Sequence, residues 1–445
     1  MTTKDPETHV HTLPNGVRVL TLVQPWLDIA SLSIFVRSGS QHESRRLNGI
    51  SHVAEHMAFK GTTTRDCQRI NLDAERLGAE VNAHTDKDHT AFHMHGLAQH
   101  APALIGMLGD IVLNSSFPAD ELERERQVIL QEYAEDEDDP LSNAYKLFDL
   151  ACWGDHPIAR PVIGQRANIR RFSRDDLLAH VRQQYTGCNV VVAACGALDP
   201  QQITRAAEAA FGAMPSGQPN TVAAPQWMGG CRHKRHAGIG QSHALLGYPI
   251  PSLQADDAAS QAAATVFGEG MSSPLLDELR ERRGLVYYAN CTAEPMAQSG
   301  QFVIEASTAP EHLSEFFTGV NRLLQAQAEG VQPVDLERAR NQTLVRLLRT
   351  QEKPFQQLET AAQELFVHGR VRPRSERIAL TQALTAGQVR DAFQRLLAAP
   401  PAVAVVGKYG SAAQAAVAAV VDRAARVGTI TDPAIPTPVP QKHLA

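Results

Sequence analysis

Residues 122–127 read Leu-Glu-Arg-Glu-Arg-Gln, and 214 positions later residues 336–341 read Leu-Glu-Arg-Ala-Arg-Asn. Two further pairs of similar segments follow in the same order, at offsets of 212 and 211. The segments are 172–173 with 384–385, and the apolar run 190–196 with 403–407. Ordered matches at a nearly constant offset indicate a duplicated domain of about 200 residues, with chance similarity between helix-rich segments as the alternative.

The composition changes where the two copies meet. Residues 214–230 are rich in proline, glycine and small residues, which is typical of an exposed linker. We therefore expect one domain over residues 1–213 and a second over 231–430. Four prolines in residues 431–445 predict a tail that forms neither a helix nor a central strand.

Strand and helix patterns alternate within the first half. Apolar runs and period-two alternation predict strands, while longer periodic segments predict helices. The expected strands cover 17–23, 32–36, 80–84 and 90–95, and the expected helices lie around 50–59, 67–77, 100–113 and 120–135. Ser173 with Asp176 forms a capping-box pattern at the start of a further helix. The pattern predicts an α+β fold with helices packed on a mostly antiparallel sheet.

Composition excludes several classes of function. The net charge is −6, with 43% apolar and 20% charged residues, and the one short basic run, 232–235, is predicted to be a solvated loop. We therefore expect no nucleic-acid partner. No run of about 18 apolar residues is present, so no membrane span is expected. The polar N-terminus and six cysteines without a C-x-x-C pair predict a cytoplasmic protein.

The segment 49–59 carries a metal-site pattern, Gly-Ile-Ser-His-Val-Ala-Glu-His-Met-Ala-Phe. On a helix, His52 and His56 lie one turn apart on the same face, and Glu55 borders that face. H-x-x-E-H is the inverzincin signature, in which two histidines hold zinc and the glutamate accepts a proton from the bound water. Two histidines with this spacing also arise by chance on surface helices, so a third ligand is required.

The segment 120–135 offers acids for this purpose. Glu125 and Glu132 are seven residues apart and therefore lie two turns apart on one helical face. The apolar residues Val128 and Ile129 between them indicate a packed helix. The alternative is a charged helix that is exposed to solvent.

These motifs resemble those of the pitrilysin-type zinc metallopeptidases, the family of insulin-degrading enzyme and mitochondrial processing peptidase. In that family the third ligand is a glutamate about 76 residues after the second histidine, on a helix reading E-R-x-V-I-x-x-E, and residues 125–132 match this pattern. The resemblance implies Glu132 as the third zinc ligand, Glu125 as the supporting acid and Glu55 as the general base. It identifies the chain as a short, bacterial-type member with two α/β rolls arranged as a half-clamshell, and as a zinc metalloendopeptidase.

The resemblance also implies a substrate site shared by the two halves. Asn82 and Ala83 belong to an N-A-x-T segment, which in the family is an edge strand that pairs with a peptide substrate. Arg280 and Tyr287, seven residues apart, match an arginine and a tyrosine that contact substrate and oxyanion opposite the zinc. The adjacent Arg282, Arg283 and Tyr288 are alternative assignments.

One zinc per chain is expected, because Ala339 and Arg346 stand in the second half at the positions of Glu125 and Glu132. Four histidines, at 84, 89, 93 and 95, are predicted not to be ligands, since no cysteine or clear carboxylate pair joins them in the sequence. In the long members of the family four such domains enclose a chamber, so the resemblance implies that this two-domain chain forms a homodimer or a heterodimer with a homologous subunit. The alternatives are an active subunit that requires such a partner, and a non-catalytic member like the core subunits of a respiratory complex.

Overall fold

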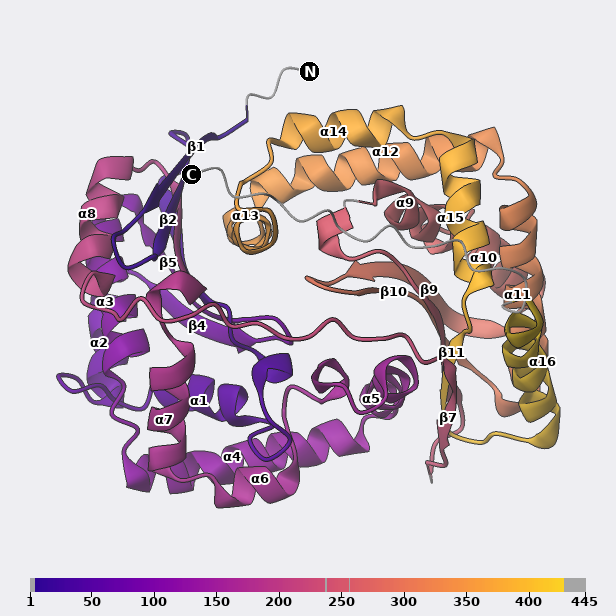
Figure 1. Cartoon of the computed structure of the whole chain (residues 1–445), viewed down its shortest axis with the longest axis horizontal. Coiled ribbons are helices and arrows are strands. Elements are labelled where there is room, and N and C mark those ends of the chain that lie inside the picture. The colour runs from indigo at the N-terminus through magenta and orange to yellow at the C-terminus, as the bar shows by residue number, and fades with distance from the viewer. Residues whose placement is uncertain (1–4, 237, 256, 428–445) are drawn as a thin grey trace, which may run out of the picture.

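The two halves of the chain each build one β-sheet in the computed structural model, which describes residues 5–236, 238–255 and 257–427. Figure 1 shows the two sheets side by side, each with helices packed around it. The first sheet contains β1 (Glu7–Thr12), β2 (Arg18–Val23), β3 (Ile29–Val36), β4 (Glu80–Thr85), β5 (Thr90–Leu97) and β6 (Val190–Gly196). The second contains β7 (Gly230–Lys234), β8 (Ser242–Pro249), β9 (Val286–Pro295), β10 (Gly300–Thr308) and β11 (Ala402–Val406).

The helices of the two halves follow one another in a similar succession. Those of the first half are α1 (Ile50–Ala58), α2 (Cys67–Arg76), α3 (Ala101–Asn114), α4 (Ala119–Asp138), α5 (Pro140–Trp153), α6 (Arg166–Arg171), α7 (Arg174–Gln184) and α8 (Pro200–Phe211). Those of the second half are α9 (Ala258–Gly268), α10 (Pro274–Leu276) with a π-helix over Asp277–Arg282, α11 (Leu313–Glu329), α12 (Pro333–Arg349), α13 (Pro354–His368), α14 (Arg374–Ala383), α15 (Ala386–Ala398) and α16 (Ser411–Val427).

The two sheets have the same strand order, which confirms the duplication. The first reads β2-β6-β3-β5-β4, with β1 added outside β2, and the second reads β7-β11-β8-β10-β9. In each sheet the first pair of this series is parallel and the following pairs are antiparallel. The expectation of two homologous α+β domains with mostly antiparallel sheets is therefore confirmed.

Local sequence explains the paired elements. The strands β6 and β11 are buried throughout, as expected of apolar strands at the interior of a sheet. The capping box predicted at Ser173 and Asp176 opens α7, and Thr385 with Gln388 forms the equivalent box at α15. The matched residues 172–173 and 384–385 thus mark the same structural position in both halves.

Each half covers one face of the other half's sheet. Phe148 and Ala144 of α5 pack against Leu245 and Ala404 of the second sheet. Conversely, α13 packs its buried leucines and alanines against β2, β3 and β6 of the first sheet. Figure 1 shows α13 beside the first sheet and α5 beside the second. The two halves are therefore interlocked by an exchange of helices.

Two segments differ from expectation. Helix α4 runs on to Asp138, since Asp136 and Glu137 pair with Lys146 of α5. The basic run 232–235 is not a loop for most of its length, because β7 pairs in parallel with β11.

Residues 215–229 form neither helix nor strand where the chain passes between the halves, and the predicted domain limits stay predictions. The proline-rich tail 431–445 lies outside the described residues.

Candidate metal centre

Helix α1 is fixed at its N-terminus by a buried carboxylate. Gly49 precedes the helix with a φ of 99°, a left-handed conformation that suits glycine. Glu43 accepts hydrogen bonds from the backbone N–H groups of Gly49 and Ser51, at 2.7 and 2.8 Å. Burial raises the pKa of Glu43 to about 6, although these hydrogen bonds oppose the rise. Apolar residues of α1, among them Val53 and Met57, pack in a core that also contains Leu122 and Ile129 of α4, so the two helices lie against each other.

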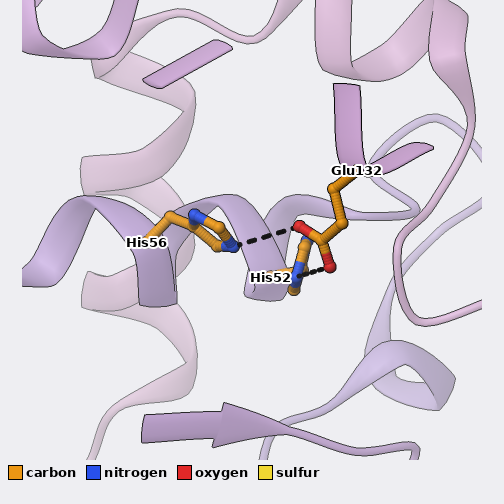
Figure 2. A group of neighbouring side chains, drawn as sticks. All are labelled: His52, His56 and Glu132. Atoms are coloured by element: carbon orange, nitrogen blue, oxygen red, sulfur yellow. Dashed lines mark ion pairs between the residues drawn. The ribbon is translucent and has the colours of Figure 1, made fainter. Parts of the chain in front are cut away.

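Three side chains from α1 and α4 meet at one place. His52 Nε2 lies 3.5 Å from Glu132 Oε1, and His56 Nε2 lies 3.5 Å from Glu132 Oε2. Figure 2 shows both imidazoles turned toward the two oxygens of this carboxylate. One ligand atom from each of the three residues lies within 4.8 Å of the others. The helix and the spacing expected from the sequence therefore bring the three predicted ligands together.

The donor set fits a zinc ion. Two imidazole nitrogens and one carboxylate are a set found in catalytic zinc sites, which keep the fourth position open. Zinc–nitrogen bonds of about 2.0–2.1 Å in a tetrahedron place ligand atoms about 3.3 Å apart. The separations of 3.5 Å between Glu132 and each histidine are close to that value.

Glu125 supports His56 from the side away from the cluster. His56 Nδ1 lies 3.0 Å from Glu125 Oε1, and Lys60 Nζ lies 2.7 Å from Glu125 Oε2. Burial raises the pKa of Glu125, but the hydrogen bonds from Lys60 and His56 outweigh it and leave the pKa lowered. An ionised Glu125 accepts the Nδ1–H of His56, which leaves the Nε2 lone pair directed toward a metal.

Hydrogen bonds also set the charge of Glu132. The contacts with His52 and His56 hold the pKa of Glu132 well below its ordinary value, against the effect of burial. Burial lowers the pKa of His56, yet its hydrogen bonds to Glu132 and Glu125 leave that pKa raised. In the metal-free chain the carboxylates are thus negative, and a cation at this position is electrostatically favoured.

Glu55 is held by a residue whose role the sequence did not reveal. Thr85 Oγ1, at the end of β4, donates a 2.6 Å hydrogen bond to Glu55 Oε2. Strand β4 is the edge of the first sheet and pairs only with β5 among the described strands. Within it, the side-chain oxygen of Asn82 accepts the backbone N–H of Ala83 at 2.8 Å. The carboxylate thus lies between the histidine helix and an edge strand.

Arg280 and Tyr287 lie in the second half and do not contact the cluster. Arg280 is in the π-helix, where its guanidinium lies 3.1 Å from Met271 Sδ, and Tyr287 is 78% exposed on β9. Among the described residues, no hydrogen bond or ion pair joins either of them to His52, His56 or Glu132. Their predicted role stays a prediction.

An ion pair occupies the corresponding helix pair of the second half. Arg346, the counterpart of Glu132, lies on α12 with Nη1 2.5 Å from Glu269 Oε2, and it also donates to Thr265 Oγ1 at 3.3 Å. Ala339, the counterpart of Glu125, is buried. The only other group of potential metal ligands in the described ranges is His84, His89 and Glu359, which combines both halves.

Models of known protein families match both halves of the chain. The model described as "Insulinase (Peptidase family M16)" matches residues 18–166, and the model described as "Peptidase M16 inactive domain" matches residues 171–343. An uncharacterized zinc protease of Rickettsia bellii is 29% identical over 401 residues, which cover 90% of this chain and 97% of the relative. An uncharacterized zinc protease of Streptomyces coelicolor is 33% identical over 320 residues, 68% of either chain.

Solved structures share the fold. A peptidase M16 inactive domain from Pseudomonas fluorescens superposes with a TM-score of 0.82 at 21% identity, covering 91% of this chain and 99% of the other. A chain of complex III2 from Candida albicans gives 0.81 at 17% identity, with 92% and 100% coverage. Within the described residues, no helix has the length and apolar character needed to cross a membrane.

Proposed function

Because the chain belongs to peptidase family M16, the insulinase family, we propose that it is a zinc-dependent endopeptidase that cleaves peptides or unfolded protein segments. One observation carries the proposal. The ligand atoms of His52, His56 and Glu132 converge, and Glu55 lies on the same helix as the two histidines. Relatives named zinc proteases support the choice of metal.

Each residue near the cluster has a distinct task in this proposal. Zinc, when bound to His52, His56 and Glu132, supplies a Lewis acid and lowers the pKa of a bound water to roughly 7. Glu55 receives a proton from the attacking water and delivers it to the leaving amine. Thr85 holds the carboxylate of Glu55 in position, and Glu125 orients His56.

The substrate binds as an added strand in this proposal. The edge of β4 at Asn82 and Ala83 offers backbone groups to an extended peptide. Main-chain hydrogen bonds recognise conformation more than side chains, so unfolded segments are preferred. Arg280 and Tyr287 stabilise negative charge that develops on the scissile carbonyl when the enclosing chamber closes.

The chamber requires a second chain. This chain carries both the metal cluster and the Arg280–Tyr287 pair, so we propose a homodimer with one catalytic zinc per chain. A heterodimer with a homologous subunit is the alternative, and gel filtration of the purified chain combined with a peptidase assay distinguishes the two.

A non-catalytic structural role is the second candidate, since the fold itself also occurs in complex III2. The complete metal cluster together with Glu55 favours the enzyme.

All six cysteines are free, so we also propose a reducing compartment such as the cytoplasm.

Glu55→Gln tests the general base directly. The amide preserves the shape of the side chain but cannot accept the proton, so turnover of a peptide library should fall by at least about 10²–10⁴-fold. Zinc content, measured by mass spectrometry, should stay at the wild-type level. Glu75→Gln, on the exposed face of α2, is the matched control. A zinc-loaded Glu55→Gln chain that cleaves at the wild-type rate would refute the assignment.

A further inference from the structure

A second cluster of metal-type ligands lies on the other face of the first sheet. His84 Nε2 is 3.3 Å from His89 Nε2, and it is also 3.3 Å from Glu359 Oε1. His89 Nε2 lies 3.8 Å from the same carboxylate oxygen. His84 is in β4 and His89 precedes β5, whereas Glu359 lies on α13, which the second half contributes.

His84 Nε2 faces two possible hydrogen-bond partners at once, His89 Nε2 and Glu359 Oε1. The Nε2 atoms of both histidines and one oxygen of Glu359 face one another within 4 Å. A neutral imidazole carries one N–H, so a single Nε2–H of His84 cannot point at both the nitrogen of His89 and the oxygen of Glu359 with good geometry. Three electron-pair donors that face each other are an arrangement that a cation satisfies.

The separations match the geometry of a small divalent ion. Metal–ligand bonds of about 2.0–2.1 Å arranged tetrahedrally give ligand-to-ligand distances of about 3.3 Å. Two of the three distances in the cluster equal that value and the third is longer by half an ångström. Imidazole and carboxylate donors suit zinc and its neighbours in the first transition series. We propose that His84, His89 and Glu359 bind a second divalent transition-metal ion of the zinc type.

The cluster is partly covered from solvent, since the side chains of His84 and Glu359 are 32% and 31% exposed. His89 is 3% exposed, and the ring of Phe355 packs against both His84 and His93. His93 is 8% exposed and its Nδ1 has no hydrogen-bond partner among the described residues. The aromatic side chain of Phe355, from the same helix that supplies Glu359, thus covers part of the cluster.

The position of the ion gives it a structural task. Successive side chains of a strand point to opposite faces of a sheet. His84 therefore faces α13, while its neighbour Thr85 faces α1 and holds Glu55. An ion on His84 ties β4 to α13 of the second half from behind the catalytic cluster. The second site does not depend on the proposed peptidase activity, and its ion is additional to the one zinc per chain expected from the sequence.

The second site can be measured by itself in a chain that lacks the histidines of the first cluster. The full chain carrying His52→Ala and His56→Ala is stripped with a chelator, then titrated with Zn²⁺ and, separately, with Co²⁺. We expect one equivalent of either metal, visible d–d absorption from Co²⁺ and a higher thermal transition. In the same background, Glu359→Gln with His84→Ala should weaken binding by at least about 100-fold, more than the loss of an outer-sphere partner.

His95→Ala is the matched control, because His95 also contacts Phe355 but is outside the cluster. It should keep the bound equivalent. Far-UV circular dichroism verifies that each variant is folded. The wild-type chain provides an independent count and should bind two equivalents. The proposal is overturned if the His52→Ala/His56→Ala chain binds no metal, if the wild type binds only one equivalent, or if Glu359→Gln with His84→Ala binds as tightly as its background.

Discussion

His56 connects two carboxylates of the metal centre, Glu132 and Glu125. One ring nitrogen faces Glu132, and the other faces Glu125, whose second oxygen is bound by Lys60. The lysine keeps Glu125 ionised, and the ionised carboxylate fixes the position of the imidazole proton. When a metal binds, the tautomer that carries its proton on Nδ1 is therefore favoured.

Removing the charge of Glu125 should therefore weaken the metal site without destroying it. Glu125→Gln can still accept a hydrogen bond from His56, but it no longer pairs with Lys60 or polarises the ring. We expect zinc affinity, measured by competition with a chelator, to fall by about 10–100-fold. Glu135→Gln, an exposed change on the same helix, should leave affinity unaltered. Unchanged affinity in Glu125→Gln would mean that another group orients His56.

Sequence spacing predicted part of this arrangement and could not predict the rest. The four-residue spacing of His52 and His56 is a property of one helix, so it is legible in the sequence. Lys60 lies four residues after His56, so its place near the same helical face is also a property of the local sequence. Glu359 joins His84 only because α13 crosses to the other half, and no local pattern encodes that crossing.

At the scale of elements, α1 is held between α4 and α7. His180 of α7 is 5% exposed, and its Nε2 lies 3.3 Å from Ser51 Oγ of α1. Burial, with a smaller effect from the charge of His42, lowers the pKa of His180 to about 4. The contact between the two helices therefore requires a neutral imidazole.

Acidification should loosen this contact. Below pH 6.5 the unfolded chain protonates His180 while the folded chain does not, so stability is lost as the pH falls from 6.5 to 4. The loss attributable to this residue is about 3 kcal/mol. His180→Gln should flatten the pH dependence of the unfolding free energy of the zinc-free chain over this range. His11→Gln, at an exposed site, serves as the control, and an equally steep dependence in His180→Gln would contradict the prediction.

Most helices and strands could be predicted from the sequence, and the exceptions depend on contacts with segments that are distant in the sequence. Periodicity predicted α1 to α4, β4 and β5 with ends that differ by a few residues. Charged residues 232–235 carry no strand pattern, and β7 forms there because β11 supplies a backbone partner. The duplication predicted equivalent sheets, yet it did not predict which half would cover each sheet with α5 or α13.

At the scale of the whole molecule, this exchange of helices predicts that the halves unfold together. Phe148 of α5 is fully buried against the second sheet, so close to Gly247 that a Cβ built there would lie 2.5 Å from its ring. Phe148→Ala should destabilise the chain by about 3–5 kcal/mol. Denaturant unfolding followed by tryptophan fluorescence and circular dichroism should show one transition at lower denaturant.

Leu150→Ala is the control on the same helix, since Leu150 is 40% exposed and its loss should cost little. Two separate transitions in Phe148→Ala, with only one of them shifted, would mean that each half is stable without the helix received from the other.

The proposed catalytic role of Tyr287 depends on its strand, β9, which corresponds to β4 of the first sheet. Strand β9 is the outermost strand of the second sheet, as β4 is of the first. Val286 pairs with Thr308 and Tyr288 pairs with Ser307, so Tyr287 is the extra residue of a bulge. A bulge re-aims a side chain, and Tyr287 is 78% exposed, whereas Tyr288 is 45% exposed. The side chain of Tyr287 is thus accessible from solvent, as the proposed contact with substrate requires.

Tyr287→Phe should therefore lower kcat for peptide cleavage by about 10²-fold, because the hydroxyl acts on charge that develops only in the transition state. KM and zinc content should stay near their wild-type values. Tyr288→Phe is the matched control, since it removes the same hydroxyl one position along the same strand. A severe loss in Tyr288→Phe with a silent Tyr287→Phe would move the assignment by one residue. If both variants were fully active, the second half would act as a wall of the chamber and not as a catalytic partner.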